Sequence, residues 1–399
     1  MKKLLLKITI LILTLSLSAF FIACDENEGE DTVQVTGTYD YQIMTGTKEN
    51  ENGDEEEYKY YKITGYQVSK EDSLKIEEGN YDDFKVEHRE IKIPETYKDL
   101  PVEEIDAAAF ANQLILTKVV IGSNIKTIGA GAFSGCTNLE YLEIPFVGKT
   151  ADAVDGERVF GHLFGSGATN DGNTEITAKL HARKNSIDGS DVVTGEDVTF
   201  KVPTSLKEVK VTDAEIVTEC SFYGMTTLQK ITFAKATEIE SHAFYGCSAL
   251  QSFDISNIVN IYQYAFASCT ALKTVNFKDA SKLELIDRNA FSACQSLFSN
   301  LVSDEEEFTT LSFNANLKEI GSNAFADCNA IKFLDLTNAK KVGEMAFANC
   351  FSIEGVTLNA DGVYGDSIFS GCVALEEDKV KNAEGKDIKK LFGKTDTEE

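Results

Sequence analysis

Residues Ile239–Ile255 read IESHAFYGCSALQSFDI, and this stretch decides the fold because variants of it recur along most of the chain. Its second part, Leu250–Ile255, ends in period-two alternation of apolar residues, which predicts a short strand with one buried face. Its first part contains Ala243–Cys247, AFYGC, whose apolar residues have the i, i+3 spacing of one helical or 3₁₀ turn. The phenylalanine of this turn is expected to fill the centre of the coil.

The pentapeptide Ala-Phe-x-x-Cys occurs six times in strict form, and three near copies extend the series. Most successive copies are 22 to 25 residues apart, and a fixed period of this size means a solenoid. One unit cannot bury its apolar side alone, so stacked copies bury it together, with their strands in a parallel sheet along one side. The predicted structural ladder consists of Phe110, Phe133, Phe222, Phe244, Phe266, Phe291, Phe325, Phe347, Phe369, Cys136, Cys247, Cys269, Cys294, Cys328, Cys350 and Cys372.

Two gaps in the ladder break the period. The gap of 89 residues between Phe133 and Phe222 is close to four repeats, which predicts about three divergent rungs. Residues 202–211 are expected to hold the strand of one of them. Residues 160–165 and the polar stretch 165–174 are expected to form an irregular rung with an insertion. The gap of 34 residues before Phe325 exceeds one repeat by twelve, and the extra residues fall near an acidic run that predicts a solvated surface loop.

The repeated unit, Ile-x-x-x-Ala-Phe-x-x-Cys-x-x-Leu-x-x-Val/Ile-x-Leu/Phe, resembles the BspA-like leucine-rich repeat, a short bacterial class, over about residues 91–375. Residues 91–102 also resemble the lead-in strand common ahead of such arrays. The resemblance implies an α/β repeat solenoid with a parallel sheet on one face and short helical or 3₁₀ turns opposite. It also implies an exported or cell-surface protein, since some members act as adhesins toward host matrix proteins or other microbes.

Both ends of the array need a cap. Residues 32–44 and 58–68 are strand-like, with a polar loop at 46–57 between them, and predict a hairpin or a small β cap at the N-terminus. Past Leu375 the chain turns polar and charged, which predicts a terminal cap and a frayed tail.

The N-terminus carries the pattern of an export signal. Three lysines precede the uncharged stretch 8–22, which is too short to span a membrane and is typical of a secretory signal peptide. Phe21–Cys24 resembles the lipobox of bacterial lipoproteins, although Leu is usual where Phe21 stands. The resemblance implies cleavage before Cys24 and lipidation of this residue; an ordinary signal peptide and an uncleaved anchor are the alternatives.

Five of the seven residues after Cys24 are acidic, which predicts a solvated tether. In some bacterial groups such residues resemble a surface-export signal, and in others Asp at this place accompanies retention in the inner membrane. We expect a lipid-anchored protein of the cell envelope, in the outer membrane or at the cell surface. The predicted organisation is a signal peptide at 1–23, the tether at 24–31, a β-rich cap at 32–90, the repeats at 91–376 with irregular or inserted parts at 146–201 and 299–316, and a polar tail at 377–399.

Composition argues against several classes of function. The chain has 65 acidic and 38 basic residues, and the net charge of −27 repels phosphate backbones, so no nucleic-acid partner is expected. The four histidines lie in different contexts, and no His-Glu-x-x-His, Gly-x-Ser-x-Gly or phosphate-binding glycine motif is present. We therefore expect no enzyme, no cofactor and no metal site. The carboxylates at 54–57 and 304–307 leave weak calcium binding open.

Cysteine usage follows the repeat. Of nine cysteines, seven hold the same repeat position, Cys24 is assigned to the lipobox, and Cys220 is out of register. Neighbouring rungs should lie about 4.8 Å apart, which is inside the Cα range of disulfides. One small residue per rung is what a buried apolar position would select, so a reduced ladder is favoured over disulfides.

The residues between the apolar positions of each strand should point away from the core and form two columns along the sheet. Exposed sheet faces are the usual binding surfaces of solenoids. The first column is Tyr141, Glu208, Lys230, Ser252, Thr274, Phe333 and Gly355, and the second is Glu143, Lys210, Thr232, Asp254, Asn276, Asp335 and Thr357. The candidate binding residues are Tyr141, Glu143, Lys230, Thr232, Ser252, Asp254, Thr274, Asn276, Phe333 and Asp335, although a merely solvated face would look the same.

These observations favour non-catalytic binding of a macromolecule. The expected partner is a protein or glycan on a host or microbial surface, with the membrane contacted through the lipid anchor. The alternative is a periplasm-facing lipoprotein scaffold without an external ligand.

Overall fold

The computed structural model describes residues 38–69, 72–73, 89–166, 172–179, 197–298 and 310–394. The chain divides into two units, Met1–Val33 and Gln34–Glu399, and every described residue belongs to the second. The predicted signal peptide, Cys24, the tether and the acidic run at 304–307 lie outside the described residues. Within the described part, no helix combines the length and apolarity needed to cross a bilayer.

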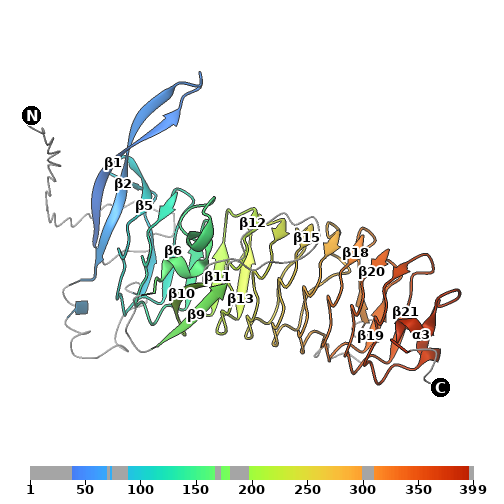
Figure 1. Ribbon diagram of the computed structural model, residues 1–399. Helices are drawn as coiled ribbons and strands as arrows, with labels where there is room; N and C mark the ends of the chain where they lie inside the picture. The colour runs from blue at the N-terminus through green and yellow to red at the C-terminus, as the bar shows by residue number, and fades with distance from the viewer. Residues whose placement is uncertain are drawn as a thin grey trace, which may run out of the picture. The chain divides into compact units, whose positions relative to one another are not determined.

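The predicted strand forms in most repeats and gives the first of two parallel ladders, which follow the stacked rungs in Figure 1. In the rungs of Ser252 and Thr274 it is reduced to an isolated bridge between these two residues. This ladder is divided into two sheets. The first sheet contains β3 (Glu90–Lys92), β6 (Lys118–Val120), β8 (Tyr141–Ile144), β11 (Glu208–Val211) and β13 (Lys230–Phe233), in that spatial order. The second sheet contains β17 (Thr310–Ser312), β19 (Phe333–Asp335), β21 (Gly355–Thr357) and β23 (Val380–Lys381). The leucine-rich repeat solenoid is thus confirmed.

A second parallel ladder precedes the Ala-Phe turns and was not predicted from the sequence. Its strands are two residues long, and in most of them the second residue is a buried aliphatic one, five positions before the ladder phenylalanine. The strands are β12 (Ile216–Val217), β14 (Glu238–Ile239), β15 (Asn260–Ile261), β16 (Leu285–Ile286), β18 (Glu319–Ile320), β20 (Lys341–Val342) and β22 (Val363–Tyr364).

The ladder phenylalanines lie in the centre of the coil, where Phe110 contacts Phe133 and the rings from Phe222 to Phe369 contact one another from rung to rung. Every predicted member from Phe110 to Phe369 has no exposed surface. In six pairs of neighbouring rungs the ring centroids lie 5.0–5.4 Å apart and the planes differ by 2–17°. Offset-stacked rings of this kind contribute about 0.5–1.5 kcal/mol per pair beyond the burial of their area.

A hydrogen bond, in addition to burial, explains why cysteine recurs at this position of the repeat. Each of the seven repeat cysteines is buried, and its thiol donates a hydrogen bond to the carbonyl oxygen of the phenylalanine one rung earlier. The Sγ–O distances are 3.0–3.2 Å, as between Cys269 and Phe244. All eight cysteines of the described part are free thiols, so the sulfur faces a carbonyl rather than another sulfur.

The Ala-Phe-x-x-Cys segment forms single turns, in agreement with the 3₁₀ form of the predicted helical or 3₁₀ turn. Cys269 donates its backbone N–H to Phe266, three residues back, as in a 3₁₀ helix. The positions two residues before and after the phenylalanine are left-handed, with φ of 56° at Tyr264 and 62° at Ser268, and this interrupts a helix. The N–H groups of Tyr264, Phe266 and Ser268 all donate to carbonyl oxygens of the next rung. Because the two outer positions are left-handed, Gly, Asn, Asp and Ser are frequent at them.

The gap between Phe133 and Phe222 holds one rung, so the prediction of about three was wrong. β8 pairs directly with β11, and β11 pairs with β13. The extra residues form a 3₁₀ segment and a hairpin: η1 (Asp155–Arg158), η2 (Phe160–Leu163), β9 (Asn173–Lys179) and β10 (Asp197–Pro203). Phe160 takes the place of the missing ladder ring, 5.0 Å from Phe222.

The N-terminal hairpin caps the array with antiparallel strands, as predicted. β1 (Thr38–Glu49) pairs with β2 (Glu55–Gln67), and β2 joins the array through β5 (Leu100–Ile105), which also pairs with β4 (Thr96–Tyr97) and β7 (Thr127–Ile128). The loop predicted at 46–57 is mostly strand. The side chain of Asn50 closes a much shorter turn by accepting bonds from the N–H groups of Asn52 and Asp54.

The polar C-terminal residues are more ordered than a frayed tail. After η4 (Glu377–Lys379), β23 adds a last strand to the first ladder, and α3 (Ile388–Leu391) follows. Phe369 donates its N–H to Leu391, whose side chain is buried, and the ring of Phe392 lies 6.0 Å from that of Phe369. The charged segment therefore closes the apolar end of the ladder.

Removing a ladder ring should destabilise the array strongly. Phe266→Ala should lower the free energy of unfolding in urea by about 3–5 kcal/mol, because it leaves a cavity between two stacked rings. Phe351→Ala is the matched control, since this ring is 47% exposed and its loss should change stability by about 0.5 kcal/mol or less. A loss below about 1 kcal/mol for Phe266→Ala would show that the ring does not pack inside.

The thiol ladder should be chemically silent in the folded protein. Burial raises the pKa of Cys136, Cys247 and Cys294 to about 12, and the thiolate is the reactive form. A water-soluble thiol reagent at neutral pH should therefore label none of the eight described cysteines until urea unfolds the chain, in a Cys24→Ala background. Rapid labelling of the folded chain, or fewer than eight thiols in urea without reductant, would contradict this arrangement.

Candidate functional site

Strand pairing joins the outward side chains of the first strand ladder in three separate stretches, and the last one includes Thr310 and Ser312 of β17, which the predicted columns left out. The strand register places Tyr141 beside Glu208 and Glu208 beside Lys230, and it places Phe333 between Thr310 and Gly355. An isolated bridge joins Ser252 and Thr274 between these two stretches. Of the ten candidate residues, Tyr141, Glu143, Phe333 and Asp335 are half-buried, and Lys230, Thr232, Ser252, Asp254, Thr274 and Asn276 are exposed.

Ion pairs between rungs cover the N-terminal part of this face. Lys118 pairs with Glu90 at 3.0 Å, Lys210 with Glu143 at 3.1 Å, and Lys230 with Glu208 at 2.7 Å. Tyr141 is enclosed by the same network, because its hydroxyl donates to Glu143 and the ammonium of Lys118 lies 5.6 Å from its ring centroid. Such exposed pairs contribute little stability, about 0–1 kcal/mol each. Their effect is that these charges are already matched within the protein.

The middle of the face is polar and locally satisfied. Asp254 accepts a hydrogen bond from the N–H of Ser256, and Asn276 bonds Asp279 through both its side-chain oxygen and its amide nitrogen. These contacts stabilise the turns after the strands. They do not bring the side chains of neighbouring rungs together into one site.

The C-terminal part of the face contains a small pocket. It has a volume of about 260 Å³ and is lined by Lys278, Thr310, Ser312, Phe313, Asp335 and Asn338. Phe313 is 1% exposed and belongs to the core, whereas the other lining residues are polar. Two of the polar groups are fixed by the backbone: Asp335 accepts a bond from the N–H of Thr337, and the amide of Asn338 donates to the carbonyl of Phe313.

The pocket lies where the first strand ladder is interrupted. In the described part of the chain, the first sheet ends at β13 and the second begins at β17, and no ladder joins the strand around Val275 to β17. Within the described residues, a backbone hydrogen bond from the N–H of Asn314 to the carbonyl oxygen of Phe277 connects the ends of these two strands. The insertion predicted before Phe325 enters the chain here. Residues 299–309 of this insertion lie outside the described residues. The pocket is lined from both sides of the break, by Lys278 on one side and by Asp335 on the other.

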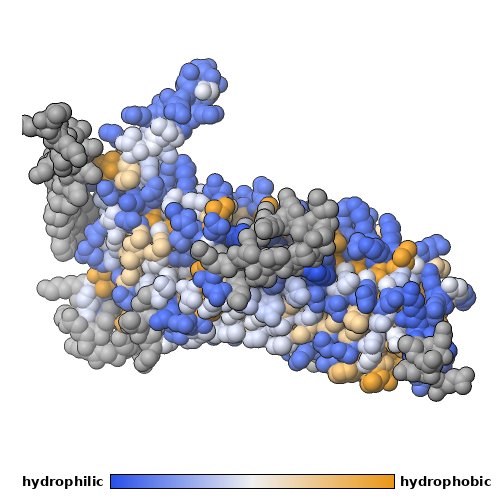
Figure 2. All heavy atoms as spheres, in the orientation of Figure 1, coloured by the Kyte–Doolittle hydropathy of each residue, from blue (hydrophilic) through white to orange (hydrophobic). Residues whose placement is uncertain are grey.

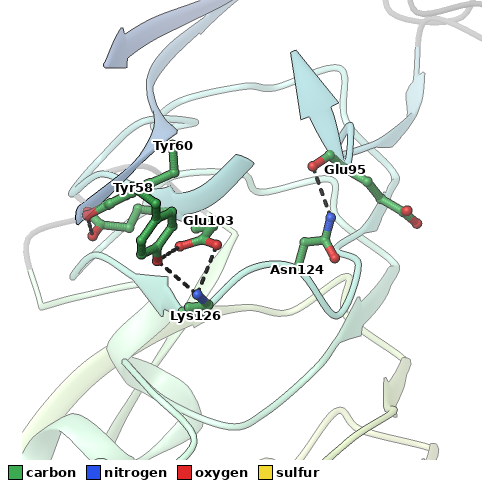
Figure 3. Close-up of polar contacts among 7 residues, drawn as sticks. Tyr58, Tyr60, Glu95, Glu103, Asn124 and Lys126 are labelled. Carbon is green, nitrogen blue, oxygen red and sulfur yellow. Dashed lines mark hydrogen bonds and ion pairs between the residues drawn. The ribbon is translucent and has the colours of Figure 1, made fainter. Parts of the chain in front are cut away.

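A second polar cluster joins the N-terminal hairpin to the first rungs. In Figure 3, Tyr58 of β2, Glu103 of β5 and Lys126 point toward one another. The hydroxyl of Tyr58 donates to Glu103, and the ammonium of Lys126 lies 2.9 Å from Glu103 and 3.0 Å from the hydroxyl of Tyr58. Glu103 is only 8% exposed, so its charge depends on these partners.

We call this cluster the clamp, because its hydrogen bonds and ion pair hold the hairpin on the first rungs. Partial burial opposes the charge of Lys126, but its bonds to Tyr58 and Glu103 outweigh this and raise the pKa of the ammonium. Burial and a hydrogen bond to Glu104 raise the pKa of Tyr60. Lys126 therefore stays protonated and Tyr60 stays neutral at neutral pH, and the groups of the cluster satisfy one another's hydrogen bonds. Figure 2 shows a mostly hydrophilic surface on the hairpin beyond the cluster, so these bonds replace apolar packing there.

No catalytic or metal centre emerges from the described residues. They contain no group of three or more His, Cys, Asp or Glu side chains placed to hold a metal ion, and the carboxylates at 54–57 lie on the hairpin turn and strand β2. His162 contacts the carbonyl of Ile128 at 3.1 Å, and burial lowers the pKa of this imidazole. His242 stacks on Tyr264 at 4.8 Å. These contacts are structural, and His88 and His181 lie outside the described residues.

The sequence identified the irregular rung at 160–165, where Val159-Phe160-x-x-Leu163 is a divergent Ala-Phe-x-x-Cys. Sequence reasoning missed two features of the candidate sites. The bonds of Tyr58 and Tyr60 to consecutive glutamates of β5 required the pairing of β2 with β5. The pocket carries no sequence signal, because it arises from a break in strand pairing and not from a motif.

The sequence matches the family model described as "BspA type Leucine rich repeat region". The match comprises 6 copies and covers residues 58–151, 196–307 and 298–392, which is more than half of the chain. No curated protein matches the chain.

Several solved structures match this chain over most of its length. A leucine-rich repeat protein from Bacteroides ovatus is 18% identical, covers 92% of this chain and 99% of its own, and has a TM-score of 0.27. One from Eubacterium ventriosum is 16% identical over 84% of this chain and 95% of its own, with a TM-score of 0.36. The pneumococcal vaccine antigen PcpA is 14% identical over 85% of this chain and 78% of its own, with a TM-score of 0.32. Likeness at this level carries no information about ligands.

Loss of the clamp should loosen the hairpin and leave the array intact. The double variant Tyr58→Phe/Tyr60→Phe removes two hydroxyls that donate to carboxylates, each worth about 1.5–3 kcal/mol when buried and less at this exposure. Amide hydrogen exchange between Met44 and Lys59 should become at least about tenfold faster, while the urea midpoint of the array stays nearly unchanged. Tyr41→Phe, on the same hairpin, is the control. Equal protection in the double variant would show that the clamp does not hold the hairpin.

Proposed function

This chain belongs to the BspA-type leucine-rich repeat family, and we propose that it is a lipid-anchored envelope protein that binds a macromolecular partner without catalysis. The anchor is Cys24, and the array stands at the cell surface. The partner is a protein or a glycan on a host cell or another microbe. The function proposed is therefore that of an adhesin.

The observation that carries this proposal is the outward face of the first strand ladder. Parallel strands hold its side chains in a fixed register from rung to rung, and the stacked phenylalanines keep the rungs rigid. A preformed surface of this kind favours binding because little conformational entropy is lost on association. The face offers hydroxyl, carboxylate, amide and ammonium groups, and its pocket at β17 and β19 gives a partner one concave point of contact.

The acidic character of the chain supports a partner other than nucleic acid or a bare anionic membrane. A net charge of −27 disfavours approach to either, unless a covalent lipid supplies the membrane affinity. Cys24 follows a short apolar segment and precedes an acidic tether, which is the arrangement expected if the array is held away from the lipid.

Protease treatment of intact cells, followed by immunoblotting, tests the location. We expect the band to disappear while a known periplasmic protein stays intact. Cys24→Ala should release the chain from the membrane fraction and change the mass of the purified protein by the loss of the lipid. A band that is cut only after the envelope is opened would overturn the adhesin and leave the periplasmic scaffold. Firm membrane retention of Cys24→Ala would overturn the lipid anchor.

A further inference from the structure

We propose that the outer edge of β1 pairs with the same edge of a second copy of this chain, so that two hairpins join into one antiparallel sheet. This inference goes beyond the proposed function and does not depend on where in the envelope the protein stands. In the described part of the chain, β1 is the last strand of its sheet, which continues only through β2 to β5. Its outer edge therefore presents backbone groups to a partner strand.

Among the described residues, no third strand supports the outer part of the hairpin. β2 pairs with β5 only from Tyr61 to Ile63, and the clamp reaches outward only to Tyr58. Beyond these contacts, β1 and β2 continue to Glu49 and Glu55 as a ribbon that extends past the other described elements (Figure 1). A two-stranded hairpin alone is at best marginally stable in water, and three or more strands are needed for an independent sheet. The hairpin of a second copy would supply the missing strands.

β1 has few of the features that protect edge strands from pairing. It is 12 residues long, contains no proline and carries one lysine, Lys48. The register shift between β1 and β2 puts the extra residue, Thr64, on β2, so β1 itself runs without a bulge. Ile43, in the middle of the strand, is 55% exposed. Short strands, prolines, bulges and charged side chains blunt the edges of natural sheets, so a long strand with few of them favours pairing.

Backbone contacts show which residues of β1 turn their peptide groups toward the partner. Asn50 donates its N–H to the carbonyl of Asp54, and the carbonyl of Asp40 accepts a bond from the hydroxyl of Thr64 in β2. Because the peptide groups of alternate strand residues point in the same direction, the even-numbered residues from 40 to 50 turn theirs toward β2. The odd-numbered residues from 39 to 49 therefore turn their N–H and C=O groups toward the open edge.

Two charged side chains of β1, Asp40 and Lys48, belong to no ion pair in the described part of the chain. Asp40 accepts a hydrogen bond from the amide of Gln67, and the ammonium of Lys48 lies 5.7 Å from the ring centroid of Tyr58. Both residues lie on the same face of the strand, because an even number of positions separates them. Opposite charges directly across two antiparallel strands stabilise the pairing, and like charges oppose it.

These two charges select the register of the pairing. When Met44 lies opposite Met44 of the second copy, each Asp40 lies opposite Lys48 of the other chain, so two ion pairs flank the two-fold axis. Moving the centre to Ile43 or Thr45 separates these charges. In the selected register the exposed Ile43 also lies diagonal to Ile43 of the second copy, within reach of contact.

Disulfide cross-linking in cells that express the full chain tests the pairing and its register. Opposed residues of a non-hydrogen-bonded antiparallel pair have Cα atoms about 4.5 Å apart, which is inside the range of about 4.4–6.8 Å for disulfides. Met44→Cys should therefore give a covalent dimer after mild oxidation, seen on a non-reducing gel. Thr47→Cys is the control, because its two copies would lie about 20 Å apart along the strands. Ile43→Cys and Thr45→Cys, each diagonal to its own copy at about 7–8 Å, should cross-link far less than Met44→Cys.

A charge exchange separates specific pairing from random collision. In the Met44→Cys background, Lys48→Asp should slow cross-linking at least about tenfold, because it sets like charges opposite each other at two places. Adding Asp40→Lys should restore the rate, since it forms both ion pairs again with opposite polarity. A role of either residue in its own hairpin alone would not produce this rescue.

The inference is overturned if Met44→Cys gives no more dimer than Thr47→Cys at equal amounts of protein, or if cross-linking is strongest at Ile43→Cys or Thr45→Cys. Failure of Asp40→Lys to restore the rate overturns it too. A product of Met44→Cys with a protein of another mass, in place of the dimer, would show that a different partner occupies the edge of β1 and would also overturn it. The proposed function fails separately, since the dimer can form whether the array is open to protease or protected inside the envelope.

Discussion

The stacking of one phenylalanine per rung on the next is the contact from which the rest of the structure follows. A single rung is too small to bury its apolar side, and the ladder rings stack on the rings of the rungs before and after them. With centroids near 5 Å, as between Phe266 and Phe291, the rings set the rung spacing, and this spacing matches the distance between hydrogen-bonded strands. The core and the two strand ladders are therefore in register with one another, and an interruption in one is accommodated by the others.

The remaining positions of the pentapeptide solve the polar problem that this stack creates. A backbone wound tightly around a ring buries N–H and C=O groups that cannot reach water. The left-handed residues on either side of the ring, such as Asn323 and Asp327, donate their N–H groups to carbonyl oxygens of the next rung. The cysteine thiol of that next rung donates a hydrogen bond to the carbonyl oxygen of the phenylalanine. Cysteine is small enough for the core and still donates a hydrogen bond. This combination explains its recurrence without disulfides or metal.

The structure of the regular rungs could be predicted from the sequence, whereas the parts where extra residues interrupt the repeat could not. The alternation Leu-x-x-Val/Ile-x-Leu assigned Tyr141, Lys230 and Phe333 to one outward column, because alternation alone decides which face a strand residue occupies. The number of rungs after Phe133 was wrong because counting by 22 assumes that extra residues make rungs, whereas here they make the hairpin of β9 and β10. The pocket was beyond prediction, since it depends on how far two strands separate at an insertion.

The contrast between regular rungs and interruptions of the repeat indicates which parts of the surface can determine binding specificity. Regular rungs present similar side chains at a constant spacing, and in the first sheet their charges are matched across rungs, as between Lys230 and Glu208. Such a surface is rigid and soluble but offers a partner no distinctive feature. Distinct geometry appears where the period breaks: in the hairpin clamped by Tyr58 and Lys126, and in the opening of the sheet beside Asp335. A protein of this architecture can thus keep its core unchanged and vary its ligand by moving an insertion from one pair of rungs to another.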